Sequence, residues 1–171
     1  IEKLNFDKTP YKNIYRTVII PSSKVEGLIK HKDIKGVSLT GSDEAGSAVG
    51  MQAGREIKKT VLELGGSDPF IVLDDADISK AAKTAITARF FNTGQSCIAA
   101  KRFLVHEAVY DQFINNVKKD IENLVVGDAL NEETQIGPLA KKEFAEDIDK
   151  LVKSSIKDGA KCMVGTEIKG C

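Results

Sequence analysis

The sequence lacks a net charge, long apolar runs and paired cysteines. Its 25 basic and 25 acidic residues balance, which removes the long-range field that attracts nucleic acids or anionic membrane surfaces. No apolar run approaches the roughly 20 residues that span a bilayer, and residues 1–4 do not have the layout of a signal peptide. We therefore expect neither a nucleic acid nor a membrane as a partner.

Cysteine and histidine are scarce. Cys97, Cys162 and Cys171 make an odd number without a C-x-x-C spacing, which argues against a disulfide framework and against a zinc ribbon. His31 and His106 have no partners at metal-ligand spacing, so we interpret both as structural and expect no metal site. A reducing, cytoplasmic location is the expectation that follows.

The 171 residues are enough for one domain or slightly more. A strand pattern followed by a helix pattern repeats over the first 64 residues, which is typical of a parallel sheet in an α/β fold. The expected strands are residues 16–20, 36–40 and 60–64. The expected helices are residues 23–31 and 43–56, the first opened by a capping box from Ser23 to Glu26, with Val25, Leu28 and Ile29 facing inward.

The pattern restarts after Gly65 and Gly66, a candidate hinge. We expect strands at 70–73, 101–106 and 161–164, and a helix from Ile78 to about Phe91 that is capped by Asp77. Two amphipathic helices complete the chain. Their predicted inward stripes are Phe113, Val117, Ile121 and Leu124, and then Phe144, Ile148, Leu151, Val152 and Ile156. Cys162 fits a buried, inert position.

Residues 40–46 join a strand end to a helix start, where backbone N–H groups and the helix dipole favour a phosphate. An ordinary βα turn has the same appearance, because the G-x-x-x-x-G spacing has no P-loop lysine. Gly46, Gly50 and Gly54 recur every fourth residue, which indicates close packing of this helix on the sheet.

Two residues have the chemistry of a covalent mechanism. Glu63 ends a strand before two glycines, where a carboxylate can act as a base or remain a solvated charge. Cys97 lies in a polar loop before Lys101 and Arg102, and nearby positive charge favours a reactive thiolate. The alternative for Cys97 is a buried, unreactive thiol.

Three segments in this order and spacing closely resemble the aldehyde dehydrogenase superfamily: residues 39–42 (Leu-Thr-Gly-Ser), 62–66 (Leu-Glu-Leu-Gly-Gly) and 90–97 (Phe-Phe-Asn-Thr-Gly-Gln-Ser-Cys). Residues 71–77, 99–103 and 136–139 are also similar to the family. The sequence of residues 97–103 (Cys-Ile-Ala-Ala-Lys-Arg-Phe) is most similar to the succinate-semialdehyde dehydrogenase branch.

The resemblance implies part of a Rossmann-like NAD(P)-binding domain over residues 1–64 and part of a catalytic domain over residues 65–171. It also implies NAD or NADP as cofactor and a small aldehyde as substrate. Cys97 would be the nucleophile and Glu63 the base. The cofactor-binding residues would be Gly41, Ser42 and Gly46 at the pyrophosphate, and Thr40 and Leu64 at the nicotinamide.

This chain also departs from the family. Phe91 stands where one succinate-semialdehyde branch has a substrate-binding arginine, and Ala99 where that branch often has a second cysteine. Family members are several hundred residues long and are expected to form homo-oligomers. We therefore expect a central fragment that is inactive alone or needs a companion chain. The alternatives are a cofactor-independent cysteine esterase and a non-catalytic, assembly-dependent segment.

Overall fold

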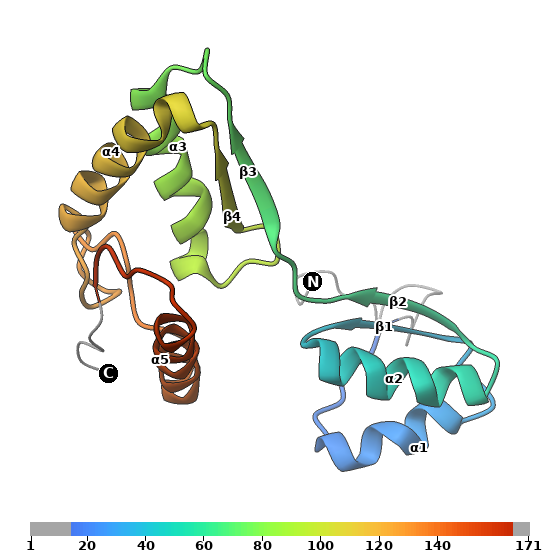
Figure 1. The fold of residues 1–171 in the computed structure, drawn as a ribbon. Coiled ribbons are helices and arrows are strands. Elements are labelled where there is room, and N and C mark those ends of the chain that lie inside the picture. Colours follow the sequence, from blue (N-terminus) through green and yellow to red (C-terminus); the bar gives the residue numbers. More distant parts are fainter. Residues whose placement is uncertain (1–14, 166–171) are drawn as a thin grey trace. The chain divides into compact units, whose positions relative to one another are not determined.

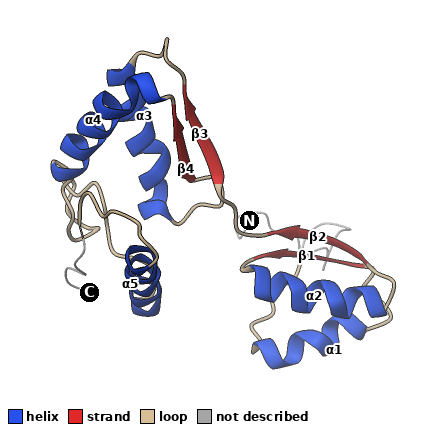
Figure 2. Cartoon of the chain, in the orientation of Figure 1, coloured by secondary structure: helices blue, strands red, loops and turns tan. Residues whose placement is uncertain are grey.

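The computed structural model describes residues 15–165, and the chain divides between Gly65 and Gly66 into two compact units (Figure 1). Each unit contains a pair of parallel strands with helices packed on it (Figure 2). The predicted α/β fold with parallel sheets is therefore confirmed. Over residues 15–165, no helix is both long and apolar enough to cross a membrane.

The first unit is a strand–helix–strand motif formed by β1 (Gly36–Thr40), α2 (Asp43–Arg55) and β2 (Lys59–Glu63). The β1–β2 register runs from Gly36 opposite Lys59 to Thr40 opposite Glu63. α1 (Val25–Lys30) and α2 lie on the same face of the two strands (Figure 1). The core between them contains Ile29, Val49 and Ala53, with Val25, Val37, Leu39 and Leu62 packed against it.

The start of α1 differs from the prediction. A 3-10 turn over Ser22–Lys24 precedes the helix, so Lys24 is the N-cap residue and no side chain caps it. Because Ser23 lies inside that turn, the expected capping box does not form.

Glu26 instead pairs with Lys30 at 2.6 Å, and the hydrogen bond from Lys30 and its positive charge lower the pKa of Glu26. Leu28, expected to face inward, is exposed.

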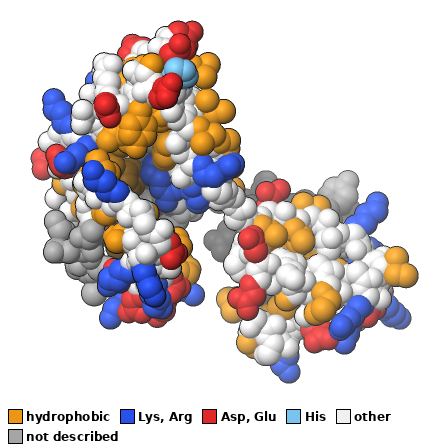
Figure 3. All heavy atoms as spheres, viewed as in Figure 1, with side chains coloured by type: hydrophobic (Ala, Val, Ile, Leu, Met, Phe, Trp, Pro, Cys, Tyr) orange, Lys and Arg blue, Asp and Glu red, His pale blue; other side chains and the backbone are white. Residues whose placement is uncertain are grey.

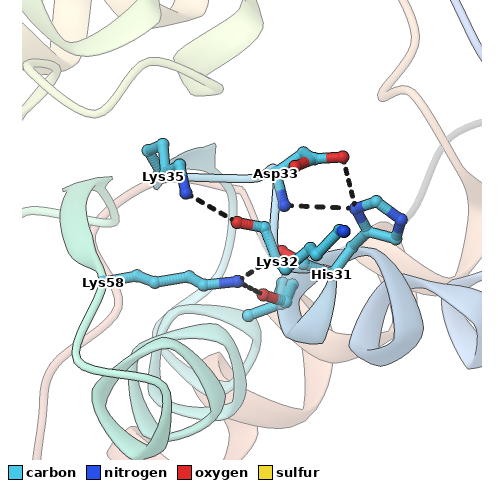
Figure 4. A network of polar contacts seen from close by, with 6 residues as sticks. His31, Lys32, Asp33, Lys35 and Lys58 are labelled. Carbon is cyan, nitrogen blue, oxygen red and sulfur yellow. Dashed lines mark hydrogen bonds and ion pairs between the residues drawn. The ribbon is translucent and has the colours of Figure 1, made fainter.

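The end of α1 is tied to the connection between α2 and β2. The Lys58 ammonium donates to the carbonyl oxygens of Ile29 and His31, the latter at 2.8 Å (Figure 4). The backbone N–H of Asp33 donates to Nδ1 of His31 at 3.3 Å. A cation at the carboxyl end of a helix is stabilising because the unpaired carbonyl groups there carry partial negative charge.

The second unit pairs β3 (Asp68–Val72) with β4 (Ala100–Val105). α3 (Ile78–Phe90) and α4 (Tyr110–Glu122) cover one face of this sheet, and a 3-10 turn, Phe91–Gly94, follows α3. The buried core contains Val72, Ile78, Ala82, Ala85 and Phe113. Asp77 caps α3 as predicted, since its Oδ1 accepts a hydrogen bond from the N–H of Lys80 at 3.0 Å.

Two expected strands are not formed. Residues 16–20 and 161–164 have no strand assignment, because neither segment has a neighbouring strand to pair with among residues 15–165.

α5 (Lys142–Lys157) forms, but it has no buried residue. Its predicted inward side chains Phe144, Ile148, Leu151 and Ile156 are 41–67% exposed, because no described segment covers them. Figure 3 shows hydrophobic side chains reaching the surface of both units.

The carboxyl end of α2 contains an unusual residue. Ile57 has φ 52°, the N–H of Lys58 returns to the carbonyl of Ala53 at 2.9 Å, and the Ile57 side chain is 95% exposed. This is the position after a helix at which glycine is preferred, since a left-handed conformation costs other residues about 1–2 kcal/mol.

We expect Ile57→Gly to raise the free energy of unfolding by about 1 kcal/mol, because it removes the left-handed penalty without removing a buried contact. The measurement is urea-induced unfolding followed by circular dichroism. Ile57→Ala is the matched control, because alanine keeps the penalty while it also removes the exposed side chain. Equal stability of the two variants would contradict this assignment.

Candidate active site

Six of the predicted site residues belong to the first unit, where the carboxyl ends of β1 and β2 meet. The backbone N–H of Gly41 donates to the carbonyl of Glu63 at 3.0 Å, which extends the strand pairing one step beyond Thr40 and Glu63. The turn after β1 and the segment after β2 are therefore held side by side. The residues gathered here are Thr40, Gly41, Ser42, Gly46, Glu63 and Leu64.

The amino end of α2 offers a small set of backbone donors. Ser42 is the N-cap residue, and its Oγ accepts a hydrogen bond from the N–H of Ala45 at 3.2 Å. The N–H of Gly46 donates to the carbonyl of Ser42 at 2.8 Å. Among the described residues, the N–H groups of Asp43 and Glu44 donate no hydrogen bond. These two donors and the helix dipole are what this end of α2 can present to an anion.

Gly46 allows α2 to approach Leu64 closely. A Cβ atom at Gly46 would lie 2.6 Å from Cδ2 of Leu64, whereas one at Gly50 would lie 3.5 Å from Cδ1 of Leu62 and one at Gly54 would meet nothing within 4 Å. The predicted close packing is therefore confirmed at Gly46 and is wrong at Gly54. Any substitution at Gly46 must displace the Leu64 side chain.

The side chain of Glu63 is exposed at the end of β2. No hydrogen bond or ion pair from its carboxylate to another residue in 15–165 is present. Next to it, Oδ1 of Asp43 accepts a hydrogen bond from the N–H of Gly65 at 3.4 Å, which connects the start of α2 to the segment that follows Glu63. The carboxylate of Glu63 is therefore available to a ligand or to water.

Cys97 lies in the second unit, after a backbone of uncommon conformation. Asn92, Thr93 and Gly94 have φ values of 51°, 57° and 75°, and non-glycine residues in this region cost on the order of 1–3 kcal/mol each. A turn then closes through a hydrogen bond of 3.1 Å from the N–H of Ala99 to the carbonyl of Ser96.

The thiol of Cys97 in this turn is exposed and free, so the buried alternative is wrong. Cys162 was expected to be buried, and it is also exposed. The side chain is exposed because residues 161–164 form no strand that would bury it. Its Sγ lies 3.0 Å from the carbonyl oxygen of Gly165. Cys171 lies outside the described residues.

Side chains that the sequence reasoning missed hold the Cys97 loop. Oε1 of Gln95 accepts a hydrogen bond from the N–H of Ala140 at 2.9 Å, across 45 residues of sequence. At the other end of the loop, Nη1 of Arg89 donates to the carbonyl of Ala100 at 3.2 Å. No sequence signal marks either contact, because each joins segments whose proximity depends on the fold.

No group of three or more His, Cys, Asp or Glu side chains within residues 15–165 has the arrangement of a metal site. Asp77 caps α3, and Nδ1 of His106 accepts a hydrogen bond from the N–H of Ala108 at 3.2 Å. These side chains therefore have local structural contacts.

Comparisons with known proteins give the family. The model of the aldehyde dehydrogenase family matches residues 12–171. The chain is 47% identical over 151 residues to a succinate-semialdehyde dehydrogenase [NADP(+)] of Mycobacterium avium, covering 88% of this chain and 32% of that protein. It is 42% identical over 165 residues to the enzyme of the same name from Deinococcus radiodurans, covering 96% of this chain and 35% of that protein.

A solved structure is also similar. The succinic semialdehyde dehydrogenase of Streptococcus pyogenes, in complex with NADP+ as the cofactor, matches with a TM-score of 0.85 and 36% identity, over 90% of this chain and 34% of that one. The chain therefore belongs to the aldehyde dehydrogenase family. The relatives that it resembles include succinate-semialdehyde dehydrogenases, and it spans about a third of the length of the curated relatives it matches.

Removing the Ser42 hydroxyl tests the amino end of α2. We expect Ser42→Ala to lower the free energy of unfolding by about 1 kcal/mol, because the N–H of Ala45 loses its acceptor. Urea-induced unfolding measures this difference. Ser42→Asp keeps an acceptor at the same position and is expected to remain near the stability of the unmodified chain. A destabilisation of equal size in both variants would show that the cap is not the cause.

Proposed function

We propose that the chain carries the nucleophile, the general base and part of the cofactor site of an NADP+-dependent aldehyde dehydrogenase. The first unit would belong to the cofactor-binding domain and the second to the catalytic domain. The observation that carries this proposal is the exposed, free thiol of Cys97, which follows the left-handed backbone segment from Asn92 to Gly94, in a chain that belongs to this family. Strained backbone of this kind is frequent at active sites.

The amino end of α2 fits a dinucleotide pyrophosphate. It has two backbone N–H groups without an acceptor, at Asp43 and Glu44, and the positive end of the helix dipole. We assign Gly41, Ser42 and Gly46 to the turn that shapes this end, and Thr40 and Leu64 to the nicotinamide. NADP+ is proposed because the Mycobacterium avium and Deinococcus radiodurans relatives carry it in their names.

The first chemical step belongs to Cys97. Its thiolate sulfur attacks the carbonyl carbon of the aldehyde, a C–S bond forms, and the carbonyl oxygen becomes an oxyanion that the backbone N–H of Cys97 stabilises. When bound, the oxidised nicotinamide supplies an acceptor for the hydride that leaves this carbon. Cys97 then holds the substrate as a thioester.

The second step belongs to Glu63. Its carboxylate takes a proton from a water molecule, and the water oxygen attacks the thioester carbon. The C–S bond breaks, the carboxylic acid leaves, and Cys97 is restored as the thiolate. An exposed carboxylate with no partner among residues 15–165 suits this role, because it can accept a proton without first breaking an ion pair.

Succinate semialdehyde is the substrate that we propose to test first, because several relatives are named for it. Phe91 is 62% exposed next to the Cys97 loop and carries no charge. Recognition of a substrate carboxylate therefore has to come from a residue other than Phe91.

The test replaces the 151-residue region of the Mycobacterium avium relative that matches this chain with the corresponding residues of this chain, and follows the absorbance of reduced nicotinamide. We expect turnover with succinate semialdehyde, lost by several orders of magnitude in Cys97→Ala and retained in Cys162→Ala. The same assay with the isolated chain is expected to show negligible turnover, because the chain spans about a third of such an enzyme.

Turnover that survives Cys97→Ala would refute the assignment of the nucleophile. Release of acid from a chromogenic ester by the isolated chain, dependent on Cys97 and independent of NADP+, would instead favour a cysteine esterase.

A further inference from the structure

Gly66 approaches the backbone of the candidate nucleophile more closely than a side chain allows. A Cβ atom at Gly66 would lie 2.7 Å from the carbonyl oxygen of Cys97 and 3.7 Å from its carbonyl carbon. Nonbonded contacts of real Cβ atoms are essentially never shorter than 3.0 Å. The atom in the way belongs to the backbone, so rotation of a side chain cannot relieve the contact.

The chain is held on both sides of this contact. On the Gly66 side, Nε of Arg102 donates to the carbonyl of Ser67 at 2.8 Å, and the pairing of β3 with β4 begins at Asp68 and Ala100. On the Cys97 side, Ala99 is 1% exposed and its N–H closes the turn onto Ser96. A side chain at position 66 must therefore be accommodated by movement of the Cys97 peptide.

We propose that Gly66 is a positioning residue for Cys97. The absence of a side chain lets the segment before β3 lie against the Cys97 carbonyl. This contact fixes the peptide plane between Cys97 and Ile98, and through it the backbone that carries the Cys97 side chain. The part of this inference that concerns catalysis rests on the proposed function, since it takes Cys97 as the nucleophile. The steric contact itself does not depend on that role.

The neighbouring glycine is a matched control. A Cβ atom at Gly65 would lie 3.7 Å from Oδ1 of Asp43, which is ordinary van der Waals contact. Neither Gly65 nor Gly66 has a positive φ in the left-handed region, so alanine meets no backbone strain at either position. Gly65→Ala and Gly66→Ala therefore differ only in what the added methyl group touches.

The experiment reads the Cys97 carbonyl directly. Labelling cysteine with ¹³C at the carbonyl and isoleucine with ¹⁵N selects one peptide bond in the 171-residue chain, Cys97–Ile98, because Cys162 precedes Met163 and Cys171 is the last residue. We expect Gly66→Ala to move this single HNCO cross-peak by more than its linewidth and Gly65→Ala to leave it in place. Equal positions in the two variants would overturn the proposal.

A second measurement needs no substitution. In the unmodified chain, the α-protons of Gly66 should give nuclear Overhauser effects to protons of residues 97 and 98. Their absence in a folded chain would also overturn the proposal, even if Gly66→Ala failed to fold.

The same samples separate this proposal from the proposed function. Acylation of Cys97 by a chromogenic ester is located by mass spectrometry, with Cys162 as internal reference. We expect the rate of Cys97 acylation to fall in Gly66→Ala by up to about 100-fold, because a small misplacement of a reacting group lowers the rate by a factor of this size. An unmodified chain that is not acylated at Cys97 would count against the nucleophile, while the cross-peak would still decide the role of Gly66.

Discussion

Parallel pairing of strands is the constraint on which the candidate residues in each unit depend. In the first unit, β1 and β2 run in the same direction, so their carboxyl ends meet and Gly41 reaches the carbonyl of Glu63. In the second unit, β3 and β4 are also parallel, so the segments that enter them run side by side and Gly66 meets Cys97. An antiparallel pair would separate these residues by the length of a strand.

Backbone shape, more than ionised side chains, defines the surroundings of the candidate residues. Gly46 lets α2 lie against Leu64, and Gly66 lets the chain lie against the Cys97 carbonyl. The left-handed segment from Asn92 to Gly94 turns the chain from α3 toward Cys97. Because these are steric conditions, they act through the backbone and do not depend on the charge of any side chain.

Apolar side chains of the second unit remain exposed on its sheet and on α5. Ile71 and Leu104 are 63% and 52% exposed on the sheet, and α5 presents an apolar stripe that no segment of residues 15–165 covers. Amphipathic periodicity correctly predicted that α5 would form. It could not predict burial, because burial depends on a second surface that periodicity within one helix does not describe.

The sequence by itself determined where most helices and strands lie, because the signals for them are local. Asp77 caps α3 as its position before the helix predicted. The alternating strand and helix patterns predicted parallel strand pairs, and both pairs are parallel. The candidate roles of Cys97 and Glu63 remain predictions from residue type and sequence context. Only the tertiary structure decided that Ser23 would not cap α1, that Cys97 is exposed, that Gln95 bonds to Ala140, and that Gly66 lies against the Cys97 carbonyl. The physical reason is that each of these depends on contacts between segments distant in sequence or on where a turn begins, and a local pattern contains neither.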